Sequence, residues 1–61
     1  MKINKFDVVE LNNGNRATIL DTKDRQTYFA DIVNAYGITV DRKEITENEI
    51  SRVIFPKEKA R

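Results

Sequence analysis

Apolar and polar residues alternate in short runs along this chain, and turn-forming residues separate the runs. In the first run, residues 6–11, Asp7, Val9 and Leu11 share one face, and a second run spans residues 16–20. A period of two is typical of a β-strand with one buried face. The intervening Asn-Asn-Gly-Asn tolerates positive φ. The pattern therefore predicts a β-hairpin around which the later strands assemble.

Two further strands are predicted at residues 27–33 and 38–45, joined by a tight turn that ends in a glycine. The face of the third strand that carries Asp31 is assigned outward, because burying an unpaired carboxylate is costly. This assignment turns the opposite face toward the core: Tyr28, Ala30 and Ile32. The centre of the fourth strand is charged, which is typical of an exposed edge strand.

Residues 46–49 fit a capping box, in which Thr46 is the N-cap and Glu49 follows three residues later. This motif predicts a single turn of 3₁₀- or α-helix. A last short strand is predicted at residues 52–55, and Pro56 ends it because proline has no N–H to donate. The charged residues 57–61 are expected to form a frayed tail.

Five short strands with one helical turn before the last predict an all-β fold, a small SH3-like barrel. The 61 residues are expected to form one domain, residues 1–61, with an ordered core over about residues 3–56. An OB-type barrel is the alternative, although it would need a longer helix between its third and fourth strands. Tyr28 is expected to lie partly in the core. The residues predicted to lie fully inside are Val9, Leu11, Ala17, Ile19, Ala30, Ile32, Val40, Ile45, Ile50 and Val53.

The composition excludes several kinds of chemistry. The chain has no Cys, so disulfides, thiolate metal sites and thiol nucleophiles are ruled out. It also has no His, the usual general base near neutral pH and a common metal ligand. The acidic residues Glu44, Glu47 and Glu49 lack the glycine turn of a calcium loop. We therefore expect that the protein is not an enzyme, that it has no catalytic residue, and that it binds no metal and no cofactor.

Charge and hydropathy narrow the choice of partners. The chain carries 11 basic and 10 acidic residues, so the overall basic excess of non-specific DNA binders is absent. No apolar run approaches the ~20 residues that span a membrane, and no signal-peptide pattern follows the first residues. We expect a cytoplasmic protein with no membrane partner.

Several short motifs resemble a family of short bacterial domains of unknown function, whose members read roughly D-V-V-x-L, G-T-I-V-E, V-E-F-V-D and G-x-T. The resemblance covers about residues 6–55 and implies an SH3-like barrel without catalytic residues. The chain departs from the family pattern at Ala17, where Gly is common, and at Arg42, where an apolar residue would be comfortable. The matching residues are Asp7-Val8-Val9-x-Leu11, Gly14, Ala17-Thr18-Ile19, Ala30-x-Ile32-Val33, Gly37, Thr39, Ile45 and Ile50.

Two kinds of binding remain as hypotheses for function. The first is a binding or assembly module that contacts another protein chain, either a different protein or a second copy of itself. Its proposed contacts are apolar residues expected on the surface: Phe29, Val33, Tyr36 and Phe55. The alternative is a barrel that binds RNA or DNA weakly, with aromatic rings on bases and basic side chains on phosphates. Its proposed basic residues are Arg16, Lys23, Arg25, Arg42, Lys43 and Arg52.

Overall fold

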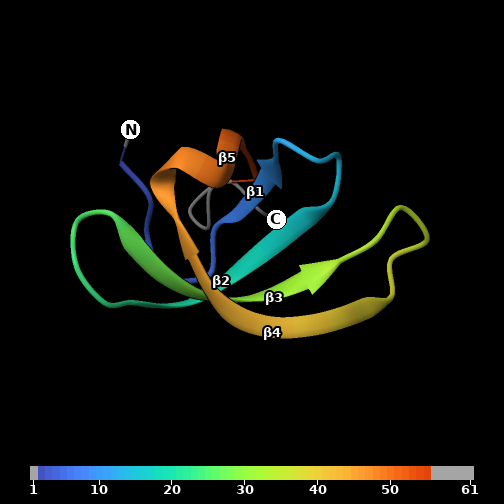
Figure 1. Cartoon of the computed structure of the whole chain (residues 1–61), viewed down its shortest axis with the longest axis horizontal. Coiled ribbons are helices and arrows are strands. Elements are labelled where there is room, and N and C mark those ends of the chain that lie inside the picture. Colours follow the sequence, from blue (N-terminus) through green and yellow to red (C-terminus); the bar gives the residue numbers. More distant parts are fainter. Residues whose placement is uncertain (1, 56–61) are drawn as a thin grey trace.

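The computed structural model describes residues 2–55, which form one antiparallel sheet of five strands (Figure 1). The all-β class predicted from the sequence is therefore confirmed, whereas Pro56 and the tail at residues 57–61 lie outside the described residues. The order of strands across the sheet is β4-β3-β2-β1-β5. The elements are β1 (Val8–Leu11), β2 (Arg16–Thr22), β3 (Thr27–Val33), β4 (Thr39–Thr46), the 3₁₀ turn η1 (Glu47–Glu49) and β5 (Ile50–Phe55).

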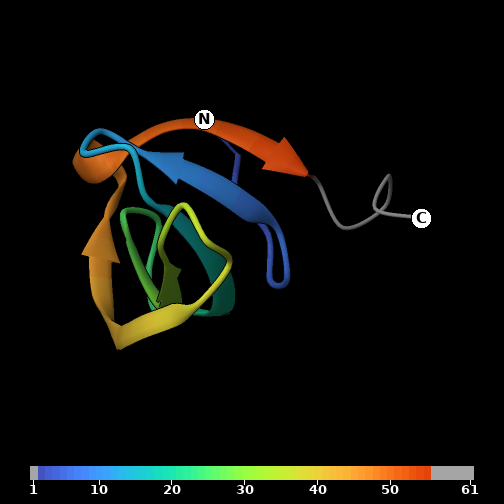
Figure 2. The same cartoon turned by 90° about the vertical axis from the view of Figure 1, so that its right-hand side faces the viewer.

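The sheet is strongly curved (Figure 2). The end formed by β1 and β5 folds back over the part formed by β2, β3 and β4, and η1 turns the chain from one part to the other. Hydrogen-bonded ladders join β4 to β3, β3 to β2, β2 to β1 and β1 to β5. Among residues 2–55 no ladder joins β4 to β5, so the sheet stays open and these two strands are its edges.

Two glycines make the hairpin turns possible. Gly14 has φ 93° in the turn between β1 and β2, where its N–H donates to the carbonyl of Leu11 at 3.0 Å. Gly37 has φ 80° between β3 and β4, and its N–H donates to the carbonyl of Asn34 at 3.0 Å. Positive φ is costly for residues with a Cβ atom. Both turns are therefore encoded locally, as the sequence predicted.

The core lies inside the curve of the sheet, where the alternating pattern placed it. Tyr28 is only 3% exposed, deeper than predicted. Val53 packs against the core but is only partly buried, and Ile3, which the pattern did not include, is buried from the N-terminal segment. The residues that are both predicted and found in the core are Val9, Leu11, Ala17, Ile19, Ala30, Ile32, Ile45 and Ile50.

The prediction that Val40 lies in the core is wrong, because this side chain is 55% exposed. On β4, Thr39 pairs with Val33 and Asp41 pairs with the preceding residue, Ile32, so Val40 is an extra residue in the ladder. Such a β-bulge changes the direction of the side chains beyond it. In addition, positions 40 and 45 differ by an odd number, so a regular strand cannot turn both toward the core.

The first strand begins at Val8 rather than at the predicted residue 6, because a tight turn precedes it. Phe6 has φ 73°, and the N–H of Asp7 donates to the carbonyl of Asn4 at 3.0 Å. The buried carboxylate of Asp7 accepts the N–H of Asn4 at 2.9 Å, which closes the turn from the other side. Left-handed backbone costs a residue with a side chain roughly 1–2 kcal/mol, so these hydrogen bonds hold Phe6 in a strained conformation.

The capping box predicted at Thr46 is confirmed. The carboxylate of Glu49 accepts the N–H of Thr46 at 2.9 Å, and η1 extends over one turn. The N–H of Glu47 donates to the carbonyl of Gln26 at 2.8 Å, which ties this turn to the loop between β2 and β3. The last strand begins at Ile50, two residues before the predicted start, because Ile50 pairs with Leu11.

Candidate functional site

The outer face of the sheet carries rows of alternating charge. Arg16 lies between Glu10 and Val33 in the ladders, and Arg52 pairs with Glu10 on the far side. The guanidinium of Arg52 donates to the carboxylate of Glu10 at 2.8 Å. In the next row Arg42 lies opposite Asp31 and donates to its carboxylate at 2.6 Å. The outer face is therefore a largely paired, polar surface.

Three of the six basic residues predicted for nucleic-acid binding are engaged in ion pairs. Besides Arg42 and Arg52, the ammonium of Lys23 lies 2.7 Å from the carboxylate of Glu44. The hydrogen bond to Glu44 raises the pKa of Lys23, and the hydrogen bond to Asp31 raises the pKa of Arg42. Each of these cations already has a nearby counter-charge.

The six predicted basic residues do not form one surface. Lys23 and Arg25 lie in the loop between β2 and β3, and Lys43 lines a groove beside β4. The remaining three belong to the rows of the outer face: Arg16, Arg42 and Arg52.

The four apolar residues predicted to bind a partner do not form one surface, although two of them, Val33 and Tyr36, line a common hollow. Phe29 is 38% exposed on β3 between Asp21 and Glu44, and Val33 is half-buried further along the same face. The residue between them on this face is Asp31, with its ion pair to Arg42. A charged pair therefore divides what the sequence predicted as one apolar patch.

The other two predicted partner contacts lie away from Phe29. Tyr36 is 86% exposed in the turn between β3 and β4, which projects from the body of the molecule (Figure 1). Phe55 is 49% exposed at the end of β5, opposite Val8. Neither ring lies next to Phe29 in any strand ladder.

A groove with an apolar floor lies beside β4, where the open sheet leaves the core incompletely covered. It has a volume of about 400 Å³. Leu11 and Ile32, which are 5% and 4% exposed, lie at its floor, and the exposed Val40 stands at its side. The bulged residue Val40 thus places an aliphatic side chain on the wall of this groove.

The rest of the lining of this groove is formed by side-chain amides and by three charged residues: Asp41, Lys43 and Glu49. The amide of Asn12 donates to the carbonyl of Asn48 at 2.7 Å, and the N–H of Asn12 donates to the carbonyl of Glu49 at 2.9 Å. Asn13 accepts the N–H of Asn15 at 2.9 Å through its side-chain oxygen. These bonds fix the turn between β1 and β2 against η1. This part of the lining is therefore held in place before any ligand arrives.

The sequence predicted these groove residues in other roles. The three asparagines of the first hairpin were predicted as turn formers, and Leu11, Ile32 and Val40 as core residues. The groove is assembled from β1, β3, β4, η1 and one turn. No local motif joins residues so far apart in the sequence, so only the curvature of the sheet reveals the site.

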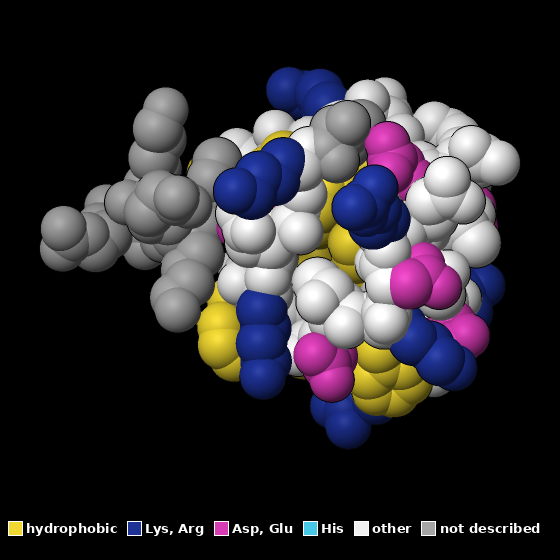
Figure 3. Space-filling model, turned by 90° about the vertical axis from the view of Figure 1, so that its left-hand side faces the viewer, with side chains coloured by type: hydrophobic (Ala, Val, Ile, Leu, Met, Phe, Trp, Pro, Cys, Tyr) yellow, Lys and Arg dark blue, Asp and Glu magenta, His cyan; other side chains and the backbone are white. Residues whose placement is uncertain are grey.

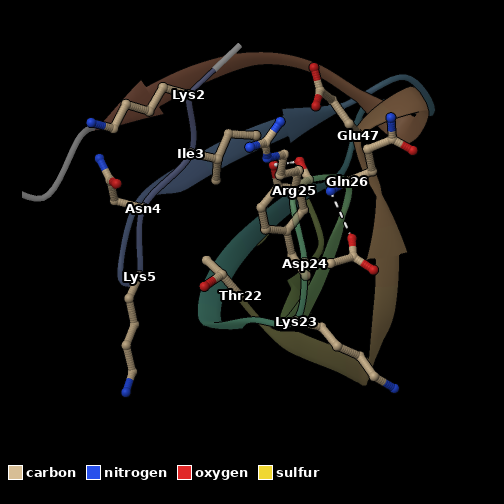
Figure 4. Close-up of a pocket in the computed structure, with 11 residues that line it drawn as sticks. Lys2, Ile3, Asn4, Lys5, Thr22, Lys23, Asp24, Arg25, Gln26 and Glu47 are labelled. Atoms are coloured by element: carbon tan, nitrogen blue, oxygen red, sulfur yellow. Dashed lines mark hydrogen bonds between the residues drawn. The ribbon is translucent and has the colours of Figure 1, made fainter.

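A second, larger hollow lies at the other end of the molecule, between the N-terminal segment and the loop that joins β2 to β3. Its volume is about 820 Å³, and Ile3 and Tyr28 line it (Figure 4). Figure 3, which views this side, shows a small apolar area flanked by Lys and Arg side chains and, on one side, by Asp and Glu side chains. Burial raises the pKa of Tyr28, whose hydroxyl donates to the carbonyl of Arg25 at 3.1 Å. The backbone N–H of Gln26 lowers the pKa of Asp24 at the rim.

No metal site is apparent among residues 2–55, where no three His, Cys, Asp or Glu residues are grouped to hold an ion. Within the same residues, no helix has the length and apolar character needed to cross a membrane.

Comparisons with protein-family models, with curated proteins and with solved structures found no match. The geometry of the two concave surfaces is therefore the basis for assigning a function.

Proposed function

We propose that this chain is a protein-binding module with an SH3-like barrel fold, which holds an extended segment of a partner protein in the groove beside β4. Three features support the barrel: the strand order β4-β3-β2-β1-β5, the strong curvature of the sheet, and a single 3₁₀ turn between β4 and β5. We also propose that the chain is related to the short bacterial domains of unknown function that it resembles. In this proposal it is a cytoplasmic protein and not an enzyme.

The exposure of Val40 is the observation that carries this proposal. An aliphatic side chain that is 55% exposed stands beside Leu11 and Ile32, which form an apolar floor. Covering such a surface with an apolar side chain of a ligand releases about 25 cal/mol for each Å² of apolar area buried. The groove therefore favours a ligand that brings at least one apolar side chain.

The surroundings of the groove favour a ligand with an extended backbone. Among residues 2–55, β4 pairs on one side only, with β3, so its other edge faces no strand. The N–H of Arg42 already donates to the side chain of Asp41 at 2.8 Å, and a further strand would pair with other backbone groups of this edge. Extended peptides commonly bind to sheet edges in this way, with alternate side chains in pockets. Asn15 and Asn48 also line the groove. Their side-chain amides both donate and accept hydrogen bonds, so they can pair with the N–H and C=O groups of a peptide backbone.

The two other surfaces considered for binding have less support. A second copy of the chain would meet an outer face on which the Arg42–Asp31 ion pair separates Phe29 from Val33. A nucleic-acid surface built from the six basic residues predicted from the sequence would use three cations that are already ion-paired. The groove beside β4 is the better candidate for a partner protein.

Selection from a display library of random linear peptides tests this proposal. We expect the wild-type chain to enrich peptides with a shared apolar position, and Val40→Asp to weaken their binding at least tenfold, because a carboxylate would face the apolar side chain. Ile38→Asp is the matched control, since Ile38 is 59% exposed on the same hairpin but does not line the groove. Enriched peptides that bind Val40→Asp and Ile38→Asp equally well would refute this site, and failure to enrich any peptide would refute the proposed function.

A further inference from the structure

The hollow between the N-terminal segment and the β2–β3 loop has an excess of basic side chains. Four basic and two acidic side chains line it: Lys2, Lys5, Lys23, Arg25, Asp24 and Glu47. Residues 2–55 as a whole carry eight basic and nine acidic side chains. Outside this hollow, the described chain therefore carries four basic and seven acidic side chains, so the basic excess is confined to the hollow.

Three of these cations are available to an anionic ligand. Lys2, Lys5 and Arg25 form no ion pair with any residue from 2 to 55, whereas Lys23 is held by Glu44 at 2.7 Å. Figure 4 shows Lys2 and Lys5 along the N-terminal segment and Arg25 above the middle of the hollow. Of the two acidic residues, Glu47 lies in η1 and Asp24 lies in the β2–β3 loop, away from the N-terminal segment. Two of the three available cations thus lie on the N-terminal segment, and the third belongs to the β2–β3 loop that faces it.

An aromatic ring adjoins the cations of the N-terminal segment. Phe6 is 48% exposed, and the ammonium of Lys5 lies 5.5 Å from the centroid of its ring. The strained turn at residues 4–7 holds Phe6 at φ 73° and directs it away from the core. Strained backbone held in place by neighbouring hydrogen bonds is common at binding sites. The turn therefore presents a cation and a ring side by side.

We propose that this hollow binds single-stranded nucleic acid, with phosphates on Lys2, Lys5 and Arg25 and a base against the ring of Phe6. Grooves that combine basic side chains with aromatic rings bind single strands because every base has a face that stacks. A flexible strand can bring successive phosphates to cations on a concave surface. A duplex is stiff over this length, and it would bring further phosphates toward Asp24 and Glu47.

The salt dependence of binding to a fluorescent decauridylate, measured by anisotropy, tests the proposal. Each phosphate contact on a single strand contributes about 0.7 to the slope of log K against log salt. Three contacts predict a slope of about −2, so that the affinity falls about 20-fold between about 50 and 200 mM salt. Arg25→Gln and Lys5→Gln should each reduce the slope by about 0.7, and Phe6→Leu should weaken binding with the slope unchanged.

Lys43→Gln is the matched control, because Lys43 also lacks an ion pair within residues 2–55 but lines the groove at the other end. It should leave the decauridylate affinity unchanged, and so should Val40→Asp, so that this result does not depend on the proposed peptide groove. Absence of binding at about 50 mM salt, or equal effects of Arg25→Gln and Lys43→Gln, would overturn the proposal. Equal affinity for a poly-glutamate of the same charge would show that the hollow does not select nucleic acid and would also overturn it.

Discussion

Ile19→Ala is expected to remove a large part of the stability of this domain. Ile19 is fully buried in β2, and it pairs with Ala30 on the neighbouring strand, which is also fully buried. The substitution removes three carbon atoms at about 0.8 kcal/mol each, and the cavity left behind brings the expected cost to about 3–5 kcal/mol. Stabilities of about 0.05–0.15 kcal/mol per residue imply a total of roughly 3–9 kcal/mol for this chain.

Urea and thermal unfolding followed by circular dichroism measure this loss. A cost of about 3 kcal/mol corresponds to a fall in Tm of about 12–24 °C in a domain of this size. Because Ile19→Ala alone is able to unfold so small a domain, Ile19→Val, with an expected cost of about 0.5–1.5 kcal/mol, provides a milder test.

The same substitutions at Ile38 provide the control, because this isoleucine is 59% exposed. Ile38→Ala and Ile38→Val should change the free energy of unfolding by less than about 0.5 kcal/mol. Equal losses at Ile19 and Ile38 would show that the register of β2 is wrong, since a shift of one residue exchanges the inner and outer faces of a strand.

Four further measurements test other parts of the structure. Thr46→Ala should cost about 0.5–2 kcal/mol through loss of the cap of η1, and a negligible change in the urea midpoint would argue against Thr46 as N-cap. EDTA should leave Tm unchanged, because the sequence has no His or Cys and residues 2–55 hold no group of acidic ligands; a shift of several degrees would reveal a metal. Light scattering over a hundredfold concentration range should give the mass of one chain, and a rising mass that Phe29→Ser abolishes would instead indicate pairing through the outer face. The pKa of Asp24 is lowered in the folded state by the backbone N–H of Gln26, so the ionised carboxylate stabilises the fold at pH values above its unfolded pKa. This contribution to stability is lost as the pH falls through the folded pKa. An NMR titration that gives Asp24 an ordinary or raised pKa would contradict the hydrogen bond from Gln26.

Features that depend only on neighbouring residues could be predicted from the amino-acid sequence. Alternation identified the inner face of β3, because pleating sends successive side chains to opposite sides of a strand. Gly14 and Gly37 identified the hairpin turns, because few other residues adopt positive φ at low cost. The capping box at Thr46 identified η1 for the same kind of local reason, since donor and acceptor lie three residues apart.

The concave parts of the surface and the pairing of its charges follow from contacts between distant parts of the chain. The position of Val40 on the wall of a groove depends on a bulge opposite Val33 and on the open edge at β4, neither of which alternation records. The partners of Arg42 and Arg52 depend on strand register, which brings together residues that are 11 and 42 positions apart. Both candidate sites collect side chains from separate turns and strands, because the curvature of the sheet, rather than any local motif, sets which of them meet.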